Sequence, residues 1–194
     1  MIVARDEQGN TCTWPSIQME FHPTANLVEF LFMPAEVSAA LEQKARNLAM
    51  DAVSALNGVG VFAVELLCDR NEDVWINEIA PRPHNSGHHT IEACYTSQYE
   101  QLNRILCGLP LGDASLIQPA AMINLLGPEG LEGAYRLDGA DAALAIPGVY
   151  IHLYNKSSIR AMRKMGHVTV MAESMDALKA KASKVRDLLR FVPA

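Results

Sequence analysis

Residues 58–89, GVGVFAVELLCDRNEDVWINEIAPRPHNSGHH, decide the fold. Two apolar runs, GVFAVELLC and VWINEIA, flank the polar segment DRNED, and this arrangement predicts a β-hairpin. The hairpin is followed by PRPHNSGHH, in which two prolines and a glycine disfavour any helix or strand. We therefore predict a loop directly after the second strand, in the kind of position where functional residues are often found.

Each predicted strand of the hairpin carries one glutamate, Glu65 or Glu78, inside an apolar run. If the loop has an even number of residues, such as residues 70–73, the two carboxylates lie directly opposite each other on one face. Such a pair needs a proton, an arginine or a divalent cation, and oxygen ligands favour magnesium or manganese. Asn77 offers a further oxygen. The alternative is that each glutamate ends a strand and points to solvent, and the spacing alone leaves both interpretations open.

The sequence before and after the hairpin predicts an α+β chain. Residues 1–33 contain short apolar segments broken by prolines, which predicts the strands of one small antiparallel sheet. An amphipathic pattern begins at Ser38 and ends at the Asn-Gly of residues 57–58, which predicts a helix. Ser97 begins a capping box for a second helix, which ends at Gly108.

A shift in composition to Gly, Pro and Asp marks residues 109–119 as the predicted linker between two domains. We assign residues 1–108 to the first domain and residues 120–194 to a smaller second domain. The second domain is predicted to contain strands at 120–127, 149–156 and 167–172, and helices at 141–145 and 174–190.

The composition indicates a globular protein without a general affinity for anionic polymers. The 194 residues are 49% hydrophobic and carry a net charge of -6, whereas nucleic-acid and anionic-membrane binders normally carry positive charge. The four cysteines fit neither a CxxC metal motif nor a disulfide framework, so free thiols are expected. No apolar run approaches the length of a membrane span, and no secretory leader is visible. We expect a cytoplasmic protein.

Hydrogen-bond donors are concentrated in the loop after the hairpin, at Arg82, His84, Asn85, Ser86 and His88. Arginine suits the binding of an anion, and an imidazole can orient a substrate or move a proton near neutral pH. His89 is more simply interpreted as a structural residue.

A second cluster is basic and consists of Lys156, Arg160, Arg163 and Lys164, four of the sixteen basic residues within nine positions. Strand alternation places Ile151 and Leu153 toward the core. His152, Tyr154 and Lys156 then share the opposite face and can reach a ligand. For an isolated cluster of this kind, a solvated basic turn is the simpler interpretation.

The segment NEIAPRPHNSGHHT, residues 77–90, resembles the signature loop of the carboxyaminoimidazole ribonucleotide synthetases, which are ATP-grasp ligases. This resemblance implies the C-terminal lobe of an ATP-grasp fold, an antiparallel sheet with helices, followed by a small α/β domain. It also implies that Glu65 and Glu78 bind magnesium against the phosphates of ATP, and that Asn77 and Glu78 contact the nucleotide.

The same resemblance implies roles for the loop. Arg82 would hold the reacting anion, and His84 would orient the acceptor amine or carry its proton, although the histidine that handles the proton is left open. Asn85 and Ser86 would bind substrate.

HLYNK, residues 152–156, and RKMGH, residues 163–167, together resemble the substrate motif of the same family. The resemblance implies that Lys156 and Arg163 bind the 5′-phosphate of aminoimidazole ribonucleotide, with Lys164 and Arg160 beside them. The sequence also departs from the family pattern. Met162 stands where the family often has glycine, so a different local backbone is expected, and Gln18 stands where an acidic residue is frequent.

The reaction implied by the resemblance belongs to purine biosynthesis. ATP and bicarbonate give carboxyphosphate, whose carboxyl group passes to the amine of aminoimidazole ribonucleotide, with release of ADP and phosphate. In this family the lysines and the glycine-rich loop that cover the phosphates precede the region matched here. We therefore expect the chain to need a missing N-terminal half and to be inactive alone.

Two alternatives remain open at this point. One is another ATP-grasp carboxylase or ligase, such as a biotin carboxylase or a glycinamide ribonucleotide enzyme. The other is a non-catalytic module that binds a nucleotide. A homodimer is a possible assembly.

Overall fold

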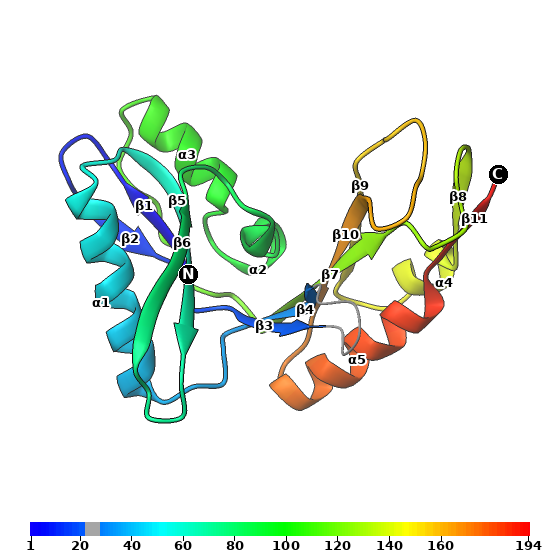
Figure 1. Cartoon of the computed structure of the whole chain (residues 1–194), viewed down its shortest axis with the longest axis horizontal. Helices are drawn as coiled ribbons and strands as arrows, with labels where there is room; N and C mark the ends of the chain where they lie inside the picture. The colour runs from blue at the N-terminus through cyan, green and yellow to red at the C-terminus, as the bar shows by residue number, and fades with distance from the viewer. Residues whose placement is uncertain (22–27) are drawn as a thin grey trace. The chain divides into compact units, whose positions relative to one another are not determined.

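The computed structural model describes residues 1–21 and 28–194, and it divides into two compact units (Figure 1). Of the described residues, unit 1 consists of 1–18 and 33–117, and unit 2 of 19–21, 28–32 and 118–194. The predicted first domain, residues 1–108, includes residues 19–21 and 28–32, which in the structure belong to unit 2. The predicted domain boundaries otherwise stay a prediction.

Unit 1 is built on a four-stranded antiparallel sheet in the order β2-β1-β5-β6. Helix α1 packs on one face, because its apolar stripe (Ala45, Ala49 and Val53) contacts Phe62 and Val64 of β5. The Ser38 hydroxyl accepts a hydrogen bond from the backbone N–H of Leu41 at 3.0 Å, which confirms the predicted start of α1. The elements are β1 (Ile2–Arg5), β2 (Thr11–Thr13), α1 (Ala39–Ala55), β5 (Gly60–Cys68) and β6 (Val74–Ala80).

Helix α3 (Gln98–Leu106) contacts β1 and β5 of the same sheet. The Ser97 hydroxyl accepts from the backbone N–H of Glu100 at 3.1 Å, so the predicted cap is present. Ahead of α3, the segment predicted to be an irregular loop, residues 81–89, contains a 3₁₀ turn (η1, Asn85–Gly87), and the short helix α2 (Thr90–Ala93) follows it. That prediction is therefore only partly correct, because both prolines lie before η1 and do not interrupt it.

The β5–β6 hairpin has the predicted glutamate pair but not the predicted loop. The turn between the strands consists of residues 69–73, an odd number. Leu66 is opposite Ile76, yet Glu65 is opposite Glu78, so Asn77 is an extra residue without a partner in the ladder. This β-bulge restores the alignment that an odd-numbered turn alone would have lost.

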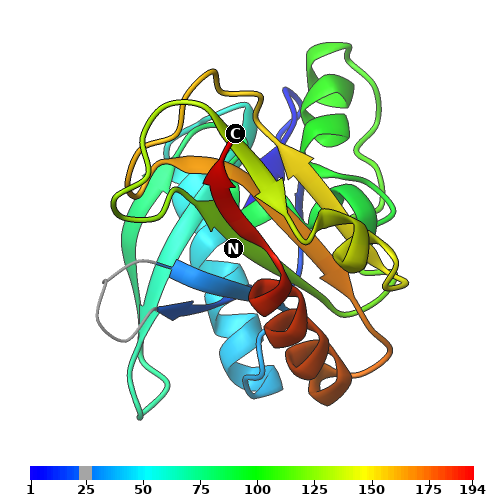
Figure 2. The ribbon, with the colours of Figure 1, turned by 90° about the vertical axis from the view of Figure 1, so that its right-hand side faces the viewer.

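Unit 2 contains a five-stranded sheet in the order β3-β4-β7-β10-β9 and a separate two-stranded sheet, β11-β8. Figure 2 shows β11 beside β8 and helix α5 along the larger sheet. In the core, Leu178 and Val185 of α5 cluster with Phe30, Phe32 and Val168. The elements are β3 (Gln18–Phe21), β4 (Val28–Met33), β7 (Ala120–Leu126), β8 (Tyr135–Asp138), α4 (Ala140–Leu144), β9 (Val149–Leu153), β10 (Lys164–Met171), α5 (Met175–Leu188) and β11 (Arg190–Pro193).

The prediction that residues 1–33 form one small sheet is wrong. Strands β1 and β2 pair within unit 1, whereas β3 and β4 extend the sheet of unit 2. The reason is packing, because Phe30 and Phe32 bury their rings in the core of unit 2. Residues 22–27, which fall inside the predicted segment, lie outside the described residues.

Two general expectations can be compared with the structure. All four cysteines are free thiols, as predicted. In the part of the chain that the structure describes, none of the helices has both the length and the apolar character needed to cross a membrane.

Candidate functional site

Glu65 and Glu78 are cross-strand partners in the hairpin. Glu65 is half-buried and Glu78 is exposed. Strand alternation puts them on the face away from α1, together with Leu67 and Trp75, whose side chains are 59% and 52% exposed. Two carboxylates in this relation repel each other unless a cation lies between them, so the face is suited to a cationic or metal-bound ligand.

The donor set fits magnesium only when the ligand supplies part of the coordination. Among residues 1–21 and 28–194, no group of three or more His, Cys, Asp or Glu side chains is arranged to hold a metal. Magnesium, however, is usually bound through one or two carboxylates together with substrate phosphates and water. The Glu65 and Glu78 pair, with the amide of Asn77 beside it, matches that second kind of site.

Arg82 follows a sharp turn at the end of β6. Its backbone N–H donates to the carbonyl oxygen of Ala80 at 2.9 Å, which reverses the chain at Pro81. The side chain is exposed, and its Nη1 donates to the carbonyl oxygen of Pro83 at 3.1 Å. A guanidinium has five N–H donors, so this single bond leaves the group able to bind an anion.

His84 caps the 3₁₀ turn with its side chain. Its Nδ1 accepts from the backbone N–H of Ser86 at 3.4 Å and lies 2.9 Å from the Ser86 hydroxyl. Because a backbone N–H can only donate, neutral His84 has its proton on Nε2. Ser86 is buried and holds His84, while Asn85 is half-buried at the start of the turn. Contacts of Asn85 and Ser86 with a substrate stay a prediction.

His89 is 1% exposed, and its Nε2 lies 2.7 Å from the sulfur of Met33. Burial, with a smaller contribution from His88, lowers the pKa of His89 to about 3. The imidazole is therefore neutral near pH 7, which agrees with a structural role.

The basic cluster lies in unit 2, in the loop between β9 and β10 and at the first residue of β10. Arg163 Nη1 donates to the carbonyl oxygen of Ser158 at 2.8 Å, which ties the end of the loop to its middle. Tyr135 donates its hydroxyl hydrogen to the carbonyl oxygen of Lys156 at 2.7 Å, which holds the beginning. Lys164 is the exposed first residue of β10. These contacts fix the backbone of the loop that carries the basic side chains. The binding of a phosphate by this loop stays a prediction.

Met162 has the backbone conformation that glycine adopts most easily. Its φ is 61°, in the left-handed region, within a turn closed by a hydrogen bond from the Arg163 N–H to the Arg160 carbonyl. Gly127 holds this turn from the neighbouring strand end, accepting from Met162 N–H at 2.8 Å and donating to Arg163 O at 2.9 Å. Met162 is thus not the glycine that the family often has, but its backbone has the left-handed conformation that glycine adopts easily.

Strand β9 follows the predicted alternation only in part. Ile151 packs against the core, but Leu153 is 42% exposed, so its predicted burial is wrong. The strand ends at Leu153, and alternation is lost there. His152 stacks on His167 with ring centroids 4.5 Å apart, and the Tyr154 hydroxyl lies 3.1 Å from His167 Nδ1.

A cavity of about 520 Å³ in unit 2 does not include the basic cluster. Its wall includes residues of β4, β7, β8 and β11 together with Gly127 and Met162, but neither Lys156 nor Arg163. Its Arg186 is bound to Glu29 at 2.7 Å and to Asp187 at 2.9 Å. We place no substrate there.

Sequence reasoning missed Gln98, a fully buried polar residue that binds the loop after the hairpin. It also missed Tyr135 and Gly127, which support the basic loop. One signal was available for Gln98. Gln98, Gln101 and Ile105 recur at the spacing of one buried helix face, so the two glutamines occupy core positions.

The comparisons with known proteins agree with this arrangement. The ATP-grasp domain model matches residues 1–99, which is half of the chain. The chain belongs to the ATP-grasp family. A second model, the phosphoribosylaminoimidazole carboxylase C-terminal domain, matches residues 120–181 of this ATP-grasp chain.

Among its relatives is the phosphoribosylaminoimidazole carboxylase, chloroplastic, of Vigna aconitifolia, with 40% identity over 183 residues, covering 93% of this chain and 32% of that protein. The structure of N5-carboxyaminoimidazole ribonucleotide synthetase from Thermotoga maritima has a TM-score of 0.91 and 41% identity, covering 100% of this chain and 51% of that chain. N5-carboxyaminoimidazole synthase from Aspergillus clavatus, in complex with ADP and 5-aminoimidazole ribonucleotide, has a TM-score of 0.84 and 34% identity, covering 96% of this chain and 49% of that chain.

These similarities confirm the predicted ATP-grasp fold and the family resemblance. The chain spans about a third to a half of the length of these proteins. The activity of the full-length relatives is therefore only a proposal for this chain.

Proposed function

We propose that this chain is the C-terminal part of an ATP-dependent ligase that carboxylates 5-aminoimidazole ribonucleotide with bicarbonate through carboxyphosphate. The observation that carries the proposal is the order of the two matched domains, an ATP-grasp domain followed by a phosphoribosylaminoimidazole carboxylase C-terminal domain. Biotin carboxylation or glycinamide ribonucleotide chemistry would not require the second domain. We propose that the protein acts in purine biosynthesis and in the cytoplasm.

The glutamate pair supports the phosphoryl-transfer step. Glu65 and Glu78 would hold magnesium together with the ATP phosphates, and Asn77 and Glu78 would contact the nucleotide. When bound, magnesium neutralises charge that develops on the phosphate oxygens. Manganese has similar ligand preferences and is expected to substitute.

The loop residues support the transfer of the carboxyl group. Arg82 presents several N–H donors on an exposed side chain, as needed to hold a carboxyphosphate or bicarbonate anion. His84, with its proton on Nε2, offers a donor to an oxygen rather than a lone pair to the amine. In its neutral form His84 therefore orients the reactants and does not remove the amine proton. Asn85 and Ser86 complete the proposed loop.

The ribonucleotide would bind through its phosphate. Lys156, Arg163 and Lys164 would hold the 5′-phosphate, because cations on one anchored loop form a local positive site in an acidic chain. We propose that an N-terminal half completes the nucleotide and ribonucleotide sites, since the relatives are longer than this chain.

We predict that replacing both Glu65 and Glu78 with glutamine abolishes magnesium-dependent ATP binding. The test is isothermal titration of magnesium-ATP into the chain joined to the N-terminal half of the Thermotoga maritima relative. The matched control, Glu129→Gln with Glu132→Gln, makes the same change in charge at two exposed positions and is expected to leave the affinity within about twofold. Unchanged affinity in the Glu65 and Glu78 double variant would show that the metal site is wrong.

A further inference from the structure

Gln98 is a polar side chain in the core of unit 1. It is the first residue of α3 and is 0% exposed, as is Thr90 of α2, which faces it. An amide buried to this extent is destabilising unless its hydrogen bonds are made. The partners of Gln98 are therefore informative about what the residue does.

The side-chain amide of Gln98 makes two hydrogen bonds with the backbone of His84. Its Oε1 accepts from the His84 N–H at 2.9 Å, and its Nε2 donates to the His84 carbonyl oxygen at 2.8 Å. A backbone N–H only donates and a carbonyl only accepts, so these two bonds determine which end of the amide is oxygen and which is nitrogen.

Gln98 also contacts His88, at the other end of the 3₁₀ turn. Its Nε2 lies 3.3 Å from His88 Nδ1, and the Tyr99 hydroxyl lies 2.8 Å from the same nitrogen. Because Nε2 of Gln98 has only hydrogens to offer, Nδ1 of His88 must accept. Neutral His88 then has its proton on Nε2, as His84 does.

The backbone of the turn is shaped around this amide. A Cβ atom added to Gly87 would lie 2.6 Å from Gln98 Oε1, so only glycine leaves room for the side chain. Thr90 closes the arrangement, because its hydroxyl donates to the Gly87 carbonyl at 2.6 Å and accepts from the Gln98 N–H at 3.0 Å.

We propose that Gln98 is a positioning residue for the proposed carboxylation, which sets the backbone of His84 and the tautomer of His88 so that both neutral imidazoles carry their proton on Nε2. The inference rests on the proposed function of the loop. Gln98 itself lies behind the loop and acts through these two histidines.

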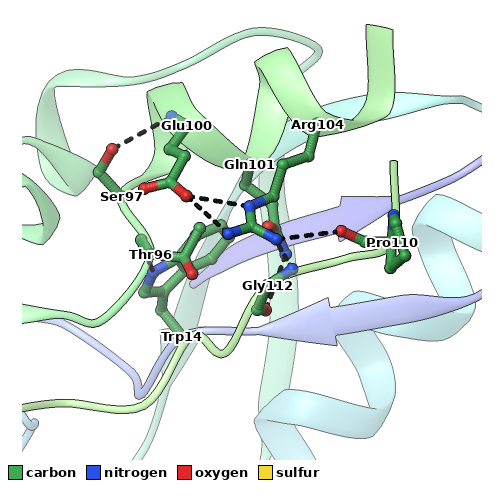
Figure 3. Close-up of polar contacts among 8 residues, drawn as sticks. All are labelled: Trp14, Thr96, Ser97, Glu100, Gln101, Arg104, Pro110 and Gly112. Atoms are coloured by element: carbon green, nitrogen blue, oxygen red, sulfur yellow. Dashed lines mark hydrogen bonds and ion pairs between the residues drawn. The ribbon is translucent and has the colours of Figure 1, made fainter. Parts of the chain in front are cut away.

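Gln101 provides a matched control on the same helix. It is also 0% exposed and also grips one backbone residue, accepting from the Gly112 N–H at 2.8 Å and donating to the Gly112 carbonyl at 3.2 Å (Figure 3). Gln101 therefore makes the same kind of contact with a different segment. Losing it is expected to cost comparable stability without affecting the histidines.

The decisive measurement is nitrogen-15 NMR of the histidine rings in the 194-residue chain at pH 8. In the wild-type chain, His84 and His88 should both show an unprotonated Nδ1 and a protonated Nε2. Gln98→Leu should shift the His88 tautomer toward Nδ1–H and increase amide hydrogen exchange at His84 at least tenfold. Gln101→Leu should leave both signals as in the wild type.

Two further variants cover the case in which Gln98→Leu fails to fold. Gln98→Glu keeps the size of the side chain, but a carboxylate cannot donate to His84 O or His88 Nδ1. Gly87→Ala keeps glutamine at position 98 and pushes its side-chain amide away from the turn. Both should reproduce the shift at His88. A protonated Nδ1 on His88 in the wild-type chain, or the same spectra in Gln98 and Gln101 variants, would overturn the proposal.

Measurements of enzyme activity distinguish a failure of the Gln98 proposal from a failure of the proposed function. In the chain joined to an N-terminal half, Gln98→Glu should reduce kcat with aminoimidazole ribonucleotide more than tenfold while changing the KM for ATP less than twofold. If the wild-type protein shows no such turnover, the proposed function fails, and the NMR result still decides the role of Gln98. Equal losses of kcat in the Gln98→Glu and Gln101→Glu proteins would mean that Gln98 is merely structural.

Discussion

At the scale of single residues, the burial of His89 makes the stability of unit 1 depend on pH. Burial lowers the pKa of His89 to about 3, below the ordinary value near 6.5. As the pH falls below 6.5, the unfolded chain takes up a proton on His89 and the folded chain does not, so stability is lost. The loss approaches about 1.4 kcal/mol per pH unit until the pH nears 3.

We predict that His89→Gln removes this part of the pH dependence. Between pH 6.5 and pH 5, the wild-type chain should lose about 1.6 kcal/mol more unfolding free energy than the variant. Urea unfolding at a series of pH values measures the difference. Parallel pH profiles for the two proteins would contradict a neutral, buried His89.

Residue-level patterns also explain what sequence reasoning could and could not find. Glu65 and Glu78 were recognisable because a carboxylate interrupts each apolar strand, and the bulge at Asn77 was not, because one extra residue leaves no periodic signal. Gln98 was missed since a polar residue on a helix normally indicates an exposed face. Its burial depends on loop partners more than ten residues away along the chain.

At the scale of elements, the basic loop is held by a neighbouring strand end. Gly127 exchanges backbone hydrogen bonds with Met162 and Arg163, and a Cβ atom on Gly127 would collide with the carbonyl oxygen of Arg160. We predict that Gly127→Ala lowers the unfolding free energy by about 1 to 3 kcal/mol, as overpacking does. Denaturant unfolding of the chain measures this change.

The control for that prediction is Gly130→Asn. Gly130 has a φ of 76°, which asparagine tolerates, and no atom lies within 4 Å of an added Cβ. Its stability should stay within about 0.5 kcal/mol of the wild type. If the Gly127→Ala protein is as stable as this control, the close packing of Gly127 against the basic loop is wrong.

Elements with strong periodicity were predictable and those set by distant contacts were not. Helices α1 and α5 begin where Ser38 and Ser174 cap them, close to the predicted positions. Strands β3 and β4 were assigned to the wrong sheet, because the pairing of β4 with the distant strand β7 is decided by burial of Phe30 and Phe32 rather than by local pattern. Strands β8 and β11 are short, and neither was predicted.

At the scale of the whole molecule, each unit supplies one part of the proposed chemistry. Unit 1 holds the glutamate pair and the loop gripped by Gln98, and unit 2 holds the basic loop. In the proposed function, the groups that cover the phosphates of ATP would come from an N-terminal half, and this chain covers only 51% of the Thermotoga maritima relative. Without that cover, water would reach carboxyphosphate and hydrolyse it.

The most direct measurement is ADP release by the purified 194-residue chain, alone and after addition of an N-terminal half, with magnesium, ATP, bicarbonate and aminoimidazole ribonucleotide. We predict no ribonucleotide-stimulated ADP release by the chain alone, and release once the N-terminal half is supplied. Biotin and glycinamide ribonucleotide should give none in either case. Turnover by the chain alone near the rate of full-length relatives, or a response to biotin or glycinamide ribonucleotide instead, would contradict the proposed function and the division of the site between two halves.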